Sequence, residues 1–362
     1  MKAAVLFESP GQLSIEEVDV AKPQPHEVVV RILATGLCHS DLHHLRQPTY
    51  MPLPLVPGHE AAGIVQDVGS EVTYVKKGDH VVTSCRGFCG HCEWCLSGRP
   101  TLCEQVGLRR TADEPARITL TDGTPCSQLG GLGTFAEQAL MHENALVKIA
   151  SDIPLESAAL LGCGVVTGVG AVIRTAKVHP GADVAVVGCG GVGLNSIQGA
   201  VIAGANHVVA IDIDDDKLEI AKQFGATHGI NSRTSDVKEE LDRILPGKGG
   251  VDYSFEALGL RETCELSFAI LRRGGTATVI GVLHGDIQIP AMKLLDECRI
   301  QGSMLGSVDV RRDTAYFLDL YRAGRLKIDE LISDRFALDQ INDGFHALTQ
   351  GGVTRSMILI GQ

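Results

Sequence analysis

The chain has 362 residues, of which 44% are hydrophobic and 21% charged, a balance typical of a soluble globular protein. This length allows two domains, each with its own core. The net charge of −12 argues against nucleic acid as a partner, because phosphate binding requires a basic surface. Residues 1–17 lack a secretory signal, so the 11 cysteines indicate a cytoplasmic protein whose thiols bind metal or fill cores rather than form disulfides.

The first half of the chain predicts short strands and turns. Segments rich in Val and Ile, bounded by Gly, Pro and Asp, predict strands at residues 2–7, 27–33, 61–68 and 79–83. A cysteine cluster follows at 85–105, then a loop region rich in Gly and Pro at 106–133. Helices are expected at 155–161 and from 164 onward.

From about residue 180 the pattern alternates between strand and helix. Strands are expected at 184–188, 207–212, 251–256 and 276–281, with helices at 191–204, 216–224 and 261–271. This alternation predicts an α/β fold with a parallel, doubly wound sheet. The uncharged stretch 184–211 is divided by glycines into strand, turn, helix and strand, so we expect no membrane span.

The alternation ends near residues 299–305. The tail predicts helices near 311–323 and 338–349 and a strand at 356–360. A β-rich first half and a mixed tail on either side of a continuous α/β region suggest that both chain ends build one domain.

Four cysteines share one short segment with the spacing C-x2-C-x2-C-x7-C: Cys89, Cys92, Cys95 and Cys103. Four thiolates with no open position describe a structural zinc site. An iron–sulfur cluster is an alternative, because C-x2-C-x2-C is also a ferredoxin pattern. Chance clustering of buried cysteines is a second alternative.

A second set of metal-binding residues is scattered along the chain. Cys38, His59 and Cys163 together offer two thiolates and an imidazole, the set of a catalytic zinc with a fourth position open to water or substrate. Asp41 can accept the second ring proton of His59 and fix its tautomer. Glu60 is either an ordinary polar residue or a carboxylate that eases ligand exchange at the metal.

A dinucleotide motif follows the strand at 184–188. The motif G-x-G-x-x-G predicts a cofactor-binding turn at the following positions: Gly188, Cys189, Gly190, Gly191, Val192 and Gly193. Gly188 permits the turn, Gly190 lets backbone approach pyrophosphate, and Gly193 allows close packing of helix on strand. Asp212 ends the next strand at the spacing of a ribose ligand. Three further aspartates at 214–216 would repel a 2′-phosphate, so we predict NAD rather than NADP.

These residues together resemble the zinc-containing medium-chain alcohol dehydrogenases, with the motif at 58–63 (GHEAAG) adding to the likeness. The resemblance runs from residue 1 to 360. It implies a GroES-like catalytic domain at 1–164 and 305–362, with the four-cysteine lobe at 85–105, and a Rossmann domain at 165–304. It also implies two zinc ions per chain, one catalytic and one structural, and oxidation of a primary alcohol to its aldehyde.

The resemblance assigns further roles. Ser40 would pass the alcohol proton to the cofactor ribose and His43 would pass it to solvent. Lys217 would contact the adenosine ribose and Arg355 the pyrophosphate. His39 stands where the family often has a pyrophosphate-binding arginine, which predicts faster NADH release. The cofactor-binding set also takes in Gly191, Val192 and Val282.

Matching positions suggest the residues that line the substrate pocket: Cys85, Leu108, Val282 and Met304. A small Cys85 would widen the pocket and admit aromatic or allylic alcohols. A thiol-dependent formaldehyde dehydrogenase, acting on S-hydroxymethyl thiols, is the alternative. Arg109 and Arg110 would then meet an acidic cosubstrate, or else be exposed and solvated.

Two other classes of protein remain as alternatives. A zinc-free quinone reductase on the same fold would lack the Cys–His–Cys ligands that this chain has. A structural or nucleic-acid-binding protein built on the four-cysteine lobe conflicts with the acidic charge and the cofactor motif. The long connection at 104–130 favours a homodimer over a tetramer.

Overall fold

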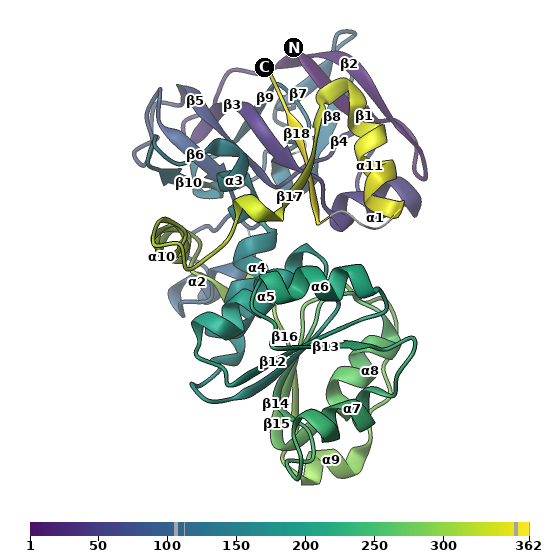
Figure 1. Ribbon diagram of the computed structural model, residues 1–362. Helices are drawn as coiled ribbons and strands as arrows, with labels where there is room; N and C mark the ends of the chain where they lie inside the picture. The colour runs from purple at the N-terminus through teal and green to yellow at the C-terminus, as the bar shows by residue number, and fades with distance from the viewer. Residues whose placement is uncertain (105–107, 112, 351–353, 362) are drawn as a thin grey trace. The chain divides into compact units, whose positions relative to one another are not determined.

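The computed structural model describes residues 1–104, 108–111, 113–350 and 354–361, and within them the chain forms two compact units (Figure 1). The first comprises Met1–Cys163, Asp309–Asp319 and Ile328–Gln362, and the second comprises Gly164–Val308 and Leu320–Lys327. The domain bounds expected from the sequence differ from these by a few residues. The segment 320–327, expected in the catalytic domain, groups with the second unit.

The first unit is built mainly of antiparallel strands. A closed barrel has the order β1-β2-β7-β8-β4, and a second sheet has the order β10-β6-β5-β3-β18-β17, with β9 also paired to β3. The strands are β1 (Lys2–Leu6), β2 (Leu13–Val20), β3 (Glu27–Gly36), β4 (Leu55–Val56), β5 (Ala61–Val68), β6 (His80–Thr83), β7 (Ile118–Leu120), β8 (Pro125–Gln128), β9 (Gln138–His142), β10 (Leu146–Ile149), β17 (Ile332–Ala337) and β18 (Arg355–Leu359).

The C-terminal strand completes this sheet. β18 pairs with β3, placing Met357 opposite Gly36. Apolar side chains from both ends of the chain share one core, in which Phe135 and Phe345 meet edge to face with their centroids 5.8 Å apart. Burying these rings together with the surrounding aliphatic side chains stabilises the unit.

The helices of the first unit are short. They are α1 (His39–Arg46), α2 (Glu93–Leu96), α3 (Leu155–Ala159) and α11 (Ile341–Gln350), and α10 (Val310–Arg322) also begins in this unit. The segment predicted as one helix at 155–161 divides into α3 and a 3₁₀ turn, η4 (Leu160–Gly162). α1 was not predicted from the sequence, because its apolar pattern is weak.

The second unit holds the predicted parallel sheet. Its order is β13-β12-β11-β14-β15-β16, and every neighbouring pair is parallel. The strands are β11 (Asp183–Val187), β12 (His207–Asp212), β13 (His228–Asn231), β14 (Val251–Glu256), β15 (Leu271–Val279) and β16 (Arg299–Gly302). β11 is buried along its whole length, as expected for a strand covered on both faces.

Helices cover both faces of this sheet. Figure 1 shows α5 and α6 on one side and α7 and α8 on the other. The helical segments of the unit are α4 (Gly164–Gly170), η5 (Ala171–Ala176, a π-helix), α5 (Gly191–Ile202), α6 (Asp215–Gln223), α7 (Val237–Ile244), α8 (Arg261–Ala269) and α9 (Ala291–Leu295). The predicted doubly wound α/β architecture is therefore confirmed.

No single helix in the described part of the chain is long and apolar enough to cross a membrane. One bent pair, Leu155–Gly162 with Gly164–Ala176, passes the test of length and composition when taken together. Most residues of this pair are buried in the protein, and core helices also pass this test.

A buried carboxylate ties the long connection after the cysteine cluster to the start of β3. Glu27 Oε1 accepts hydrogen bonds from Arg110 Nε at 3.0 Å and Arg117 Nε at 2.7 Å. Arg117 Nη2 in turn donates to the carbonyl of Leu108 at 2.8 Å. Burial alone would raise the pKa of Glu27, but the bonds from Arg110, Gln24 and Arg117 hold that pKa below its ordinary value.

Replacing Glu27 by Gln should strongly destabilise the protein. The change leaves two buried guanidinium groups without their carboxylate, and breaking a buried ion pair costs about 3–5 kcal/mol. Urea unfolding at pH 7 measures this difference, with exposed Glu8→Gln as the matched control.

The effect of Glu27 should also depend on pH. Because its folded pKa is lowered, its contribution is present above the unfolded pKa and is lost as pH falls through the folded value. The gap between wild type and Glu27→Gln should therefore narrow in acid. Equal unfolding free energies at pH 7 would contradict this account.

Candidate active site

Cys38, His59 and Cys163 converge on one point in the first unit. Their ligand atoms all lie within 4.8 Å of one another. Two ligand atoms bound to one tetrahedral zinc lie about 3.3–3.8 Å apart, so this group is compact enough to share an ion. Cys38 and His59 are buried and Cys163 is half-buried.

Strand pairing brings the first two residues together. β3 pairs with β5, and the N–H of Gly36 donates to the carbonyl of Glu60 at 2.7 Å. Cys38 follows β3 as the N-cap of α1, and His59 precedes β5. Thr83 holds the backbone of His59, because its hydroxyl donates to the His59 carbonyl at 3.1 Å.

A close backbone approach brings in the third residue. A Cβ placed on Gly162 would lie 2.8 Å from the carbonyl oxygen of Thr83 and 3.3 Å from the Cα of Glu60. A side chain at position 162 would therefore push η4 away from β6. Glycine at this position lets the following residue, Cys163, reach the other two.

Asp41 fixes the orientation of the imidazole. Its Oδ1 lies 3.1 Å from His59 Nδ1 and accepts the N–H of Gly58 at 2.9 Å. Burial would lower the pKa of His59, but Asp41 and Cys38 raise it well above its ordinary value. With Nδ1 engaged by the carboxylate, Nε2 is the nitrogen available to a metal.

The electrostatics of the cluster fit a cation. A hydrogen bond with Cys163 and the neighbouring His59 hold the pKa of the Cys38 thiol well below its ordinary value. Two sulfurs and one imidazole nitrogen are the soft donor set that zinc prefers, and they leave a fourth position without a protein ligand. The residues present therefore fit a catalytic zinc.

Glu60 and Arg355 form a buried ion pair beside the cluster. Arg355 Nη1 lies 3.3 Å from Glu60 Oε2, and both residues are buried. Burial would lower the pKa of Arg355, but Glu60 and Cys38 raise it. This structure therefore gives Arg355 a partner in the first unit, and its predicted contact with pyrophosphate stays a prediction.

The proposed proton-relay residues lie on α1. Ser40 Oγ is 3.6 Å from Cys38 Sγ. His39 is exposed and His43 half-buried. Sequence reasoning did not single out the next residue, His44, which is buried and lies 2.7 Å from Thr49 Oγ1 through Nδ1. Nothing in the sequence indicates which of the two neighbouring histidines is the buried one.

Of the predicted pocket residues, Cys85 lies at the cluster of Cys38, His59 and Cys163. It is half-buried and hydrogen-bonds with Cys163, and this bond lowers the pKa of the Cys85 thiol. Leu108 is buried, and its Cδ1 lies 3.1 Å from where a Cβ on Gly87 would be. Val282 and Met304 are exposed and belong to the second unit.

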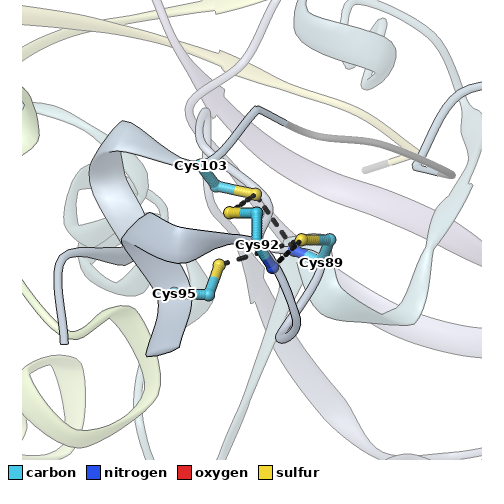
Figure 2. A group of neighbouring side chains, drawn as sticks. All are labelled: Cys89, Cys92, Cys95 and Cys103. Carbon is cyan, nitrogen blue, oxygen red and sulfur yellow. Dashed lines mark hydrogen bonds between the residues drawn. The ribbon is translucent and has the colours of Figure 1, made fainter. Parts of the chain in front are cut away.

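The four-cysteine cluster also converges (Figure 2). The ligand atoms of all four residues lie within 4.8 Å of one another. The backbone N–H of Cys89 donates to Cys103 Sγ at 3.1 Å, and that of Cys92 donates to Cys89 Sγ at 3.3 Å. Backbone N–H groups of Cys95 and Glu104 lower the pKa of Cys92 to about 6. These donors favour the thiolate of Cys92, whereas burial raises the pKa of Cys95 to about 12, so a bound cation would be needed to hold all four residues as thiolates.

Arg311 packs against the segment that holds the four cysteines. The sequence analysis did not single out this residue. Its guanidinium lies 3.4 Å from the ring centroid of Tyr74 and 5.0 Å from that of Phe88, the residue before Cys89. It also donates to the carbonyl of Glu143 at 3.1 Å. No local pattern marks an arginine for such a contact, because its partners lie far away in the chain.

The glycine motif of the second unit has the backbone geometry that its sequence predicts. Gly188 has φ +94°, and a Cβ on Gly193 would lie 1.8 Å from the Gly188 carbonyl oxygen. Gly190 is the N-cap of α5, and a Cβ there would meet nothing within 4 Å. Gly191 and Val192, both half-buried, begin α5. The open space at Gly190 suits close approach by a phosphate.

Asp212 lies beside this turn. Its Oδ2 accepts the N–H of Cys189 at 2.7 Å, and its Oδ1 accepts the N–H of Ile213 at 2.8 Å. Burial and the Asp212 carboxylate raise the pKa of the Cys189 thiol, which the charge of Lys217 opposes. The predicted ribose-binding residues Asp212 and Lys217 therefore both lie near the glycine turn.

Comparison with known proteins decides the family. The model of the alcohol dehydrogenase GroES-like domain matches residues 24–151, and that of the zinc-binding dehydrogenases matches residues 191–322. A class-3 alcohol dehydrogenase of Pisum sativum is 38% identical, over 99% of this chain and 97% of the relative. The chain belongs to the zinc-containing medium-chain alcohol dehydrogenases. As a member of this family it is an oxidoreductase.

Solved structures of this family are similar along almost the whole chain. A benzyl alcohol dehydrogenase from Acinetobacter calcoaceticus has a TM-score of 0.91 and 33% identity, covering 99% of each chain. A zinc-binding dehydrogenase from Sinorhizobium meliloti 1021, solved with NADP bound, has a TM-score of 0.82 and 27% identity, covering 99% of this chain and 98% of the other. The predicted combination of a GroES-like β-rich domain and a Rossmann sheet is confirmed.

The two cysteine-containing clusters predict the metal content of this dehydrogenase. Wild-type protein should hold two zinc ions per chain by elemental analysis. Cys163→Ser should hold about one, because a serine hydroxyl is a poor zinc ligand beside soft thiolates.

Cys126→Ser is the matched control, since Cys126 is buried in the first unit but belongs to neither cluster. It should keep both ions. Two zinc ions in Cys163→Ser would show that this residue is not a ligand. Iron with visible absorption in the wild type would favour a cluster of the ferredoxin type.

Proposed function

We propose that this alcohol dehydrogenase transfers a hydride from a primary alcohol, preferably benzylic or allylic, to NAD⁺ and releases the aldehyde. The convergence of Cys38, His59 and Cys163 carries the proposal, because two thiolates and an imidazole leave one position open on a zinc ion. The family supports the reaction class. The substrate, the cofactor preference and the roles of single residues are proposed from the residues of this chain.

We assign zinc binding and proton transfer to separate residues of the first unit. Cys38, His59 and Cys163 would hold the zinc, which when bound supplies a Lewis acid that lowers the pKa of an alcohol. Asp41 holds His59 in the orientation that presents Nε2. Ser40, whose hydroxyl lies 3.6 Å from Cys38 Sγ, would pass the substrate's hydroxyl proton to the ribose of the bound cofactor, and His43 would pass that proton on to solvent. The nicotinamide ring of bound NAD⁺ would supply the acceptor for the hydride of the alcohol.

Asp212 supports NAD as the preferred cofactor. Its carboxylate lies beside the glycine turn, and three more aspartates follow it at 214–216. A 2′-phosphate in this place would be repelled by several negative charges. The neighbour solved with NADP shares the fold, but this acidic segment argues for NAD in the present chain.

The surroundings of Cys85 support a bulky alcohol. Cys85 hydrogen-bonds with Cys163, so its side chain is adjacent to the metal cluster. A thiol at this place leaves room that an aromatic side chain would fill. The similar structure from Acinetobacter is a benzyl alcohol dehydrogenase, which is consistent with this substrate class.

Formaldehyde bound to a thiol is the second candidate substrate, the alternative that the resemblance to this family leaves open. The structure gives one observation against an acidic cosubstrate. Arg110 is bound to Glu27 and its side chain is buried, so it is not available to a carboxylate from solvent. Arg109 remains exposed.

We also propose that the protein is a cytoplasmic homodimer. β16 is an edge strand of its sheet, and nearby α9 exposes three apolar side chains, those of Met292, Leu294 and Leu295. Such an edge suits pairing with a second copy.

We further propose that His39 weakens cofactor binding. His39 is exposed and, when neutral, would hold pyrophosphate less tightly than an arginine.

A kinetic panel tests the proposed substrate and cofactor. Benzyl alcohol with NAD⁺ should exceed ethanol in kcat/KM by at least about tenfold, the discrimination that extra apolar contact provides. NADP⁺ should be the poorer cofactor with every alcohol. Higher kcat/KM with NADP⁺ would refute the role of Asp212. Formaldehyde with a low-molecular-weight thiol outperforming every alcohol would establish the second candidate.

Changing Cys85 to Phe should narrow the proposed pocket. We expect kcat/KM for benzyl alcohol to fall about tenfold or more, while that for ethanol changes by less than about threefold. Cys85→Ala, which keeps the space open, is the matched control and should retain activity with both alcohols. Zinc content should stay the same in both variants. An equal loss with both alcohols would mean that Cys85 does not set substrate size.

A further inference from the structure

Glu256 is a carboxylate without a role in the mechanism above, yet it is fully buried. It ends β14 and pairs with Val187 of β11 on one side and with Val279 of β15 on the other. Val187 directly precedes Gly188, the first residue of the glycine motif. Glu256 therefore lies at the carboxyl edge of the sheet, where open α/β sheets bind their ligands.

The carboxylate holds the loop that follows β14. Its Oε1 accepts the backbone N–H of Leu258 at 2.9 Å and that of Gly259 at 2.8 Å. It also accepts the hydroxyl of Thr263, in α8, at 2.7 Å. Three donors converge on one oxygen, an arrangement that an ionised acceptor strengthens. Burial, followed by the charge of Glu256, raises the pKa of the adjacent Cys264 thiol to about 12.

The same residue also holds the loop that follows β15. The carbonyl of Glu256 accepts the N–H of Ile280 at 2.8 Å and that of Gly281 at 3.1 Å. A Cβ on Gly281 would lie 2.0 Å from the nitrogen of Gly259 and 2.7 Å from Glu256 Oε2. The loops at 257–260 and 280–282 therefore pack backbone against backbone around Glu256.

These two loops present apolar side chains next to the glycine motif. A Cβ on Gly188 would lie 2.6 Å from Leu258 Cγ, so Leu258 covers that turn. A Cβ on Gly259 would lie 2.5 Å from the carbonyl oxygen of Val282. Leu258 is 49% exposed and Val282 is 55% exposed. Large apolar side chains left open beside a cofactor motif suit a flat, partly apolar ligand.

We propose that Glu256 is a positioning residue for the nicotinamide cofactor, which fixes the two loops so that Leu258 and Val282 form a rigid apolar surface beside Gly188. The inference rests on the cofactor use stated in the proposed function. A loop ordered before binding does not lose conformational entropy when the cofactor arrives, and this raises affinity. Glu256 itself is too buried to touch the cofactor.

Measurement of NADH binding to zinc-loaded protein tests this role. In Glu256→Ala the dissociation constant for NADH should rise about tenfold, the equivalent of losing one charge-assisted hydrogen bond. Glu256→Gln keeps an oxygen acceptor and should stay within about threefold of wild type. Glu262→Ala removes an exposed carboxylate from α8 and should leave NADH binding unchanged.

Steady-state kinetics give a readout that a purely structural role would not move. In Glu256→Ala the KM for NAD⁺ should rise while kcat at saturating NAD⁺ changes little, because the residue does not touch reacting groups. Leu258→Ala shortens a side chain that is 49% exposed and leaves the hydrogen bonds of Glu256 in place, so it keeps the inference testable if Glu256→Ala does not fold. It should weaken NADH binding about threefold.

Wild-type NADH affinity in Glu256→Ala, with only a lower melting temperature, would overturn the inference. So would wild-type affinity in Leu258→Ala, or an equal loss in Glu262→Ala. NADH binding is measured without any alcohol. If the NADH affinities of the variants fall in the expected order but the wild-type protein oxidises no alcohol, the proposed function is refuted and this inference is supported.

Discussion

Two thiols and an imidazole meet in the interior of the first unit, where little water is present to stabilise their charges. Burial of such groups is costly unless opposite charges and hydrogen bonds compensate. Cys38 and His59 stabilise each other's charged forms, Asp41 binds the far side of the imidazole, and Arg355 adds a positive charge. A divalent cation bound here would displace the protons of these ligands, and its charge would then offset the charge of the thiolates.

The backbone around the cluster is arranged to permit this convergence. η4 lies so close to β6 that only glycine fits at position 162. The glycine motif of the second unit follows the same rule, because a side chain at Gly193 would collide with the carbonyl of Gly188. In both places the absence of a Cβ sets the distance between two segments, and that distance determines where the functional groups lie.

The long cationic side chains show how tertiary structure selects among roles that a sequence leaves open. Arg110 was a candidate for an acidic cosubstrate, and the structure binds it to Glu27, 83 positions away in the chain. Arg355 lies against Glu60, 295 positions away, while its predicted contact with pyrophosphate stays a prediction. An arginine side chain is long and flexible, so its partner depends on which carboxylate the fold brings within reach.

The sequence by itself determined the α/β class, the glycine turn and both groups of candidate metal ligands, because these follow from short-range spacing or from the few residue types that bind metals. Spacing of two residues places thiolates in one turn, and G-x-G-x-x-G follows from local backbone geometry. Only the tertiary structure decided that Cys85 lies against Cys163, that Arg311 packs on Phe88 beside the four-cysteine cluster, and that Glu256 holds two loops together. Those contacts join residues from different elements, and no periodicity in the chain records which buried atoms will meet.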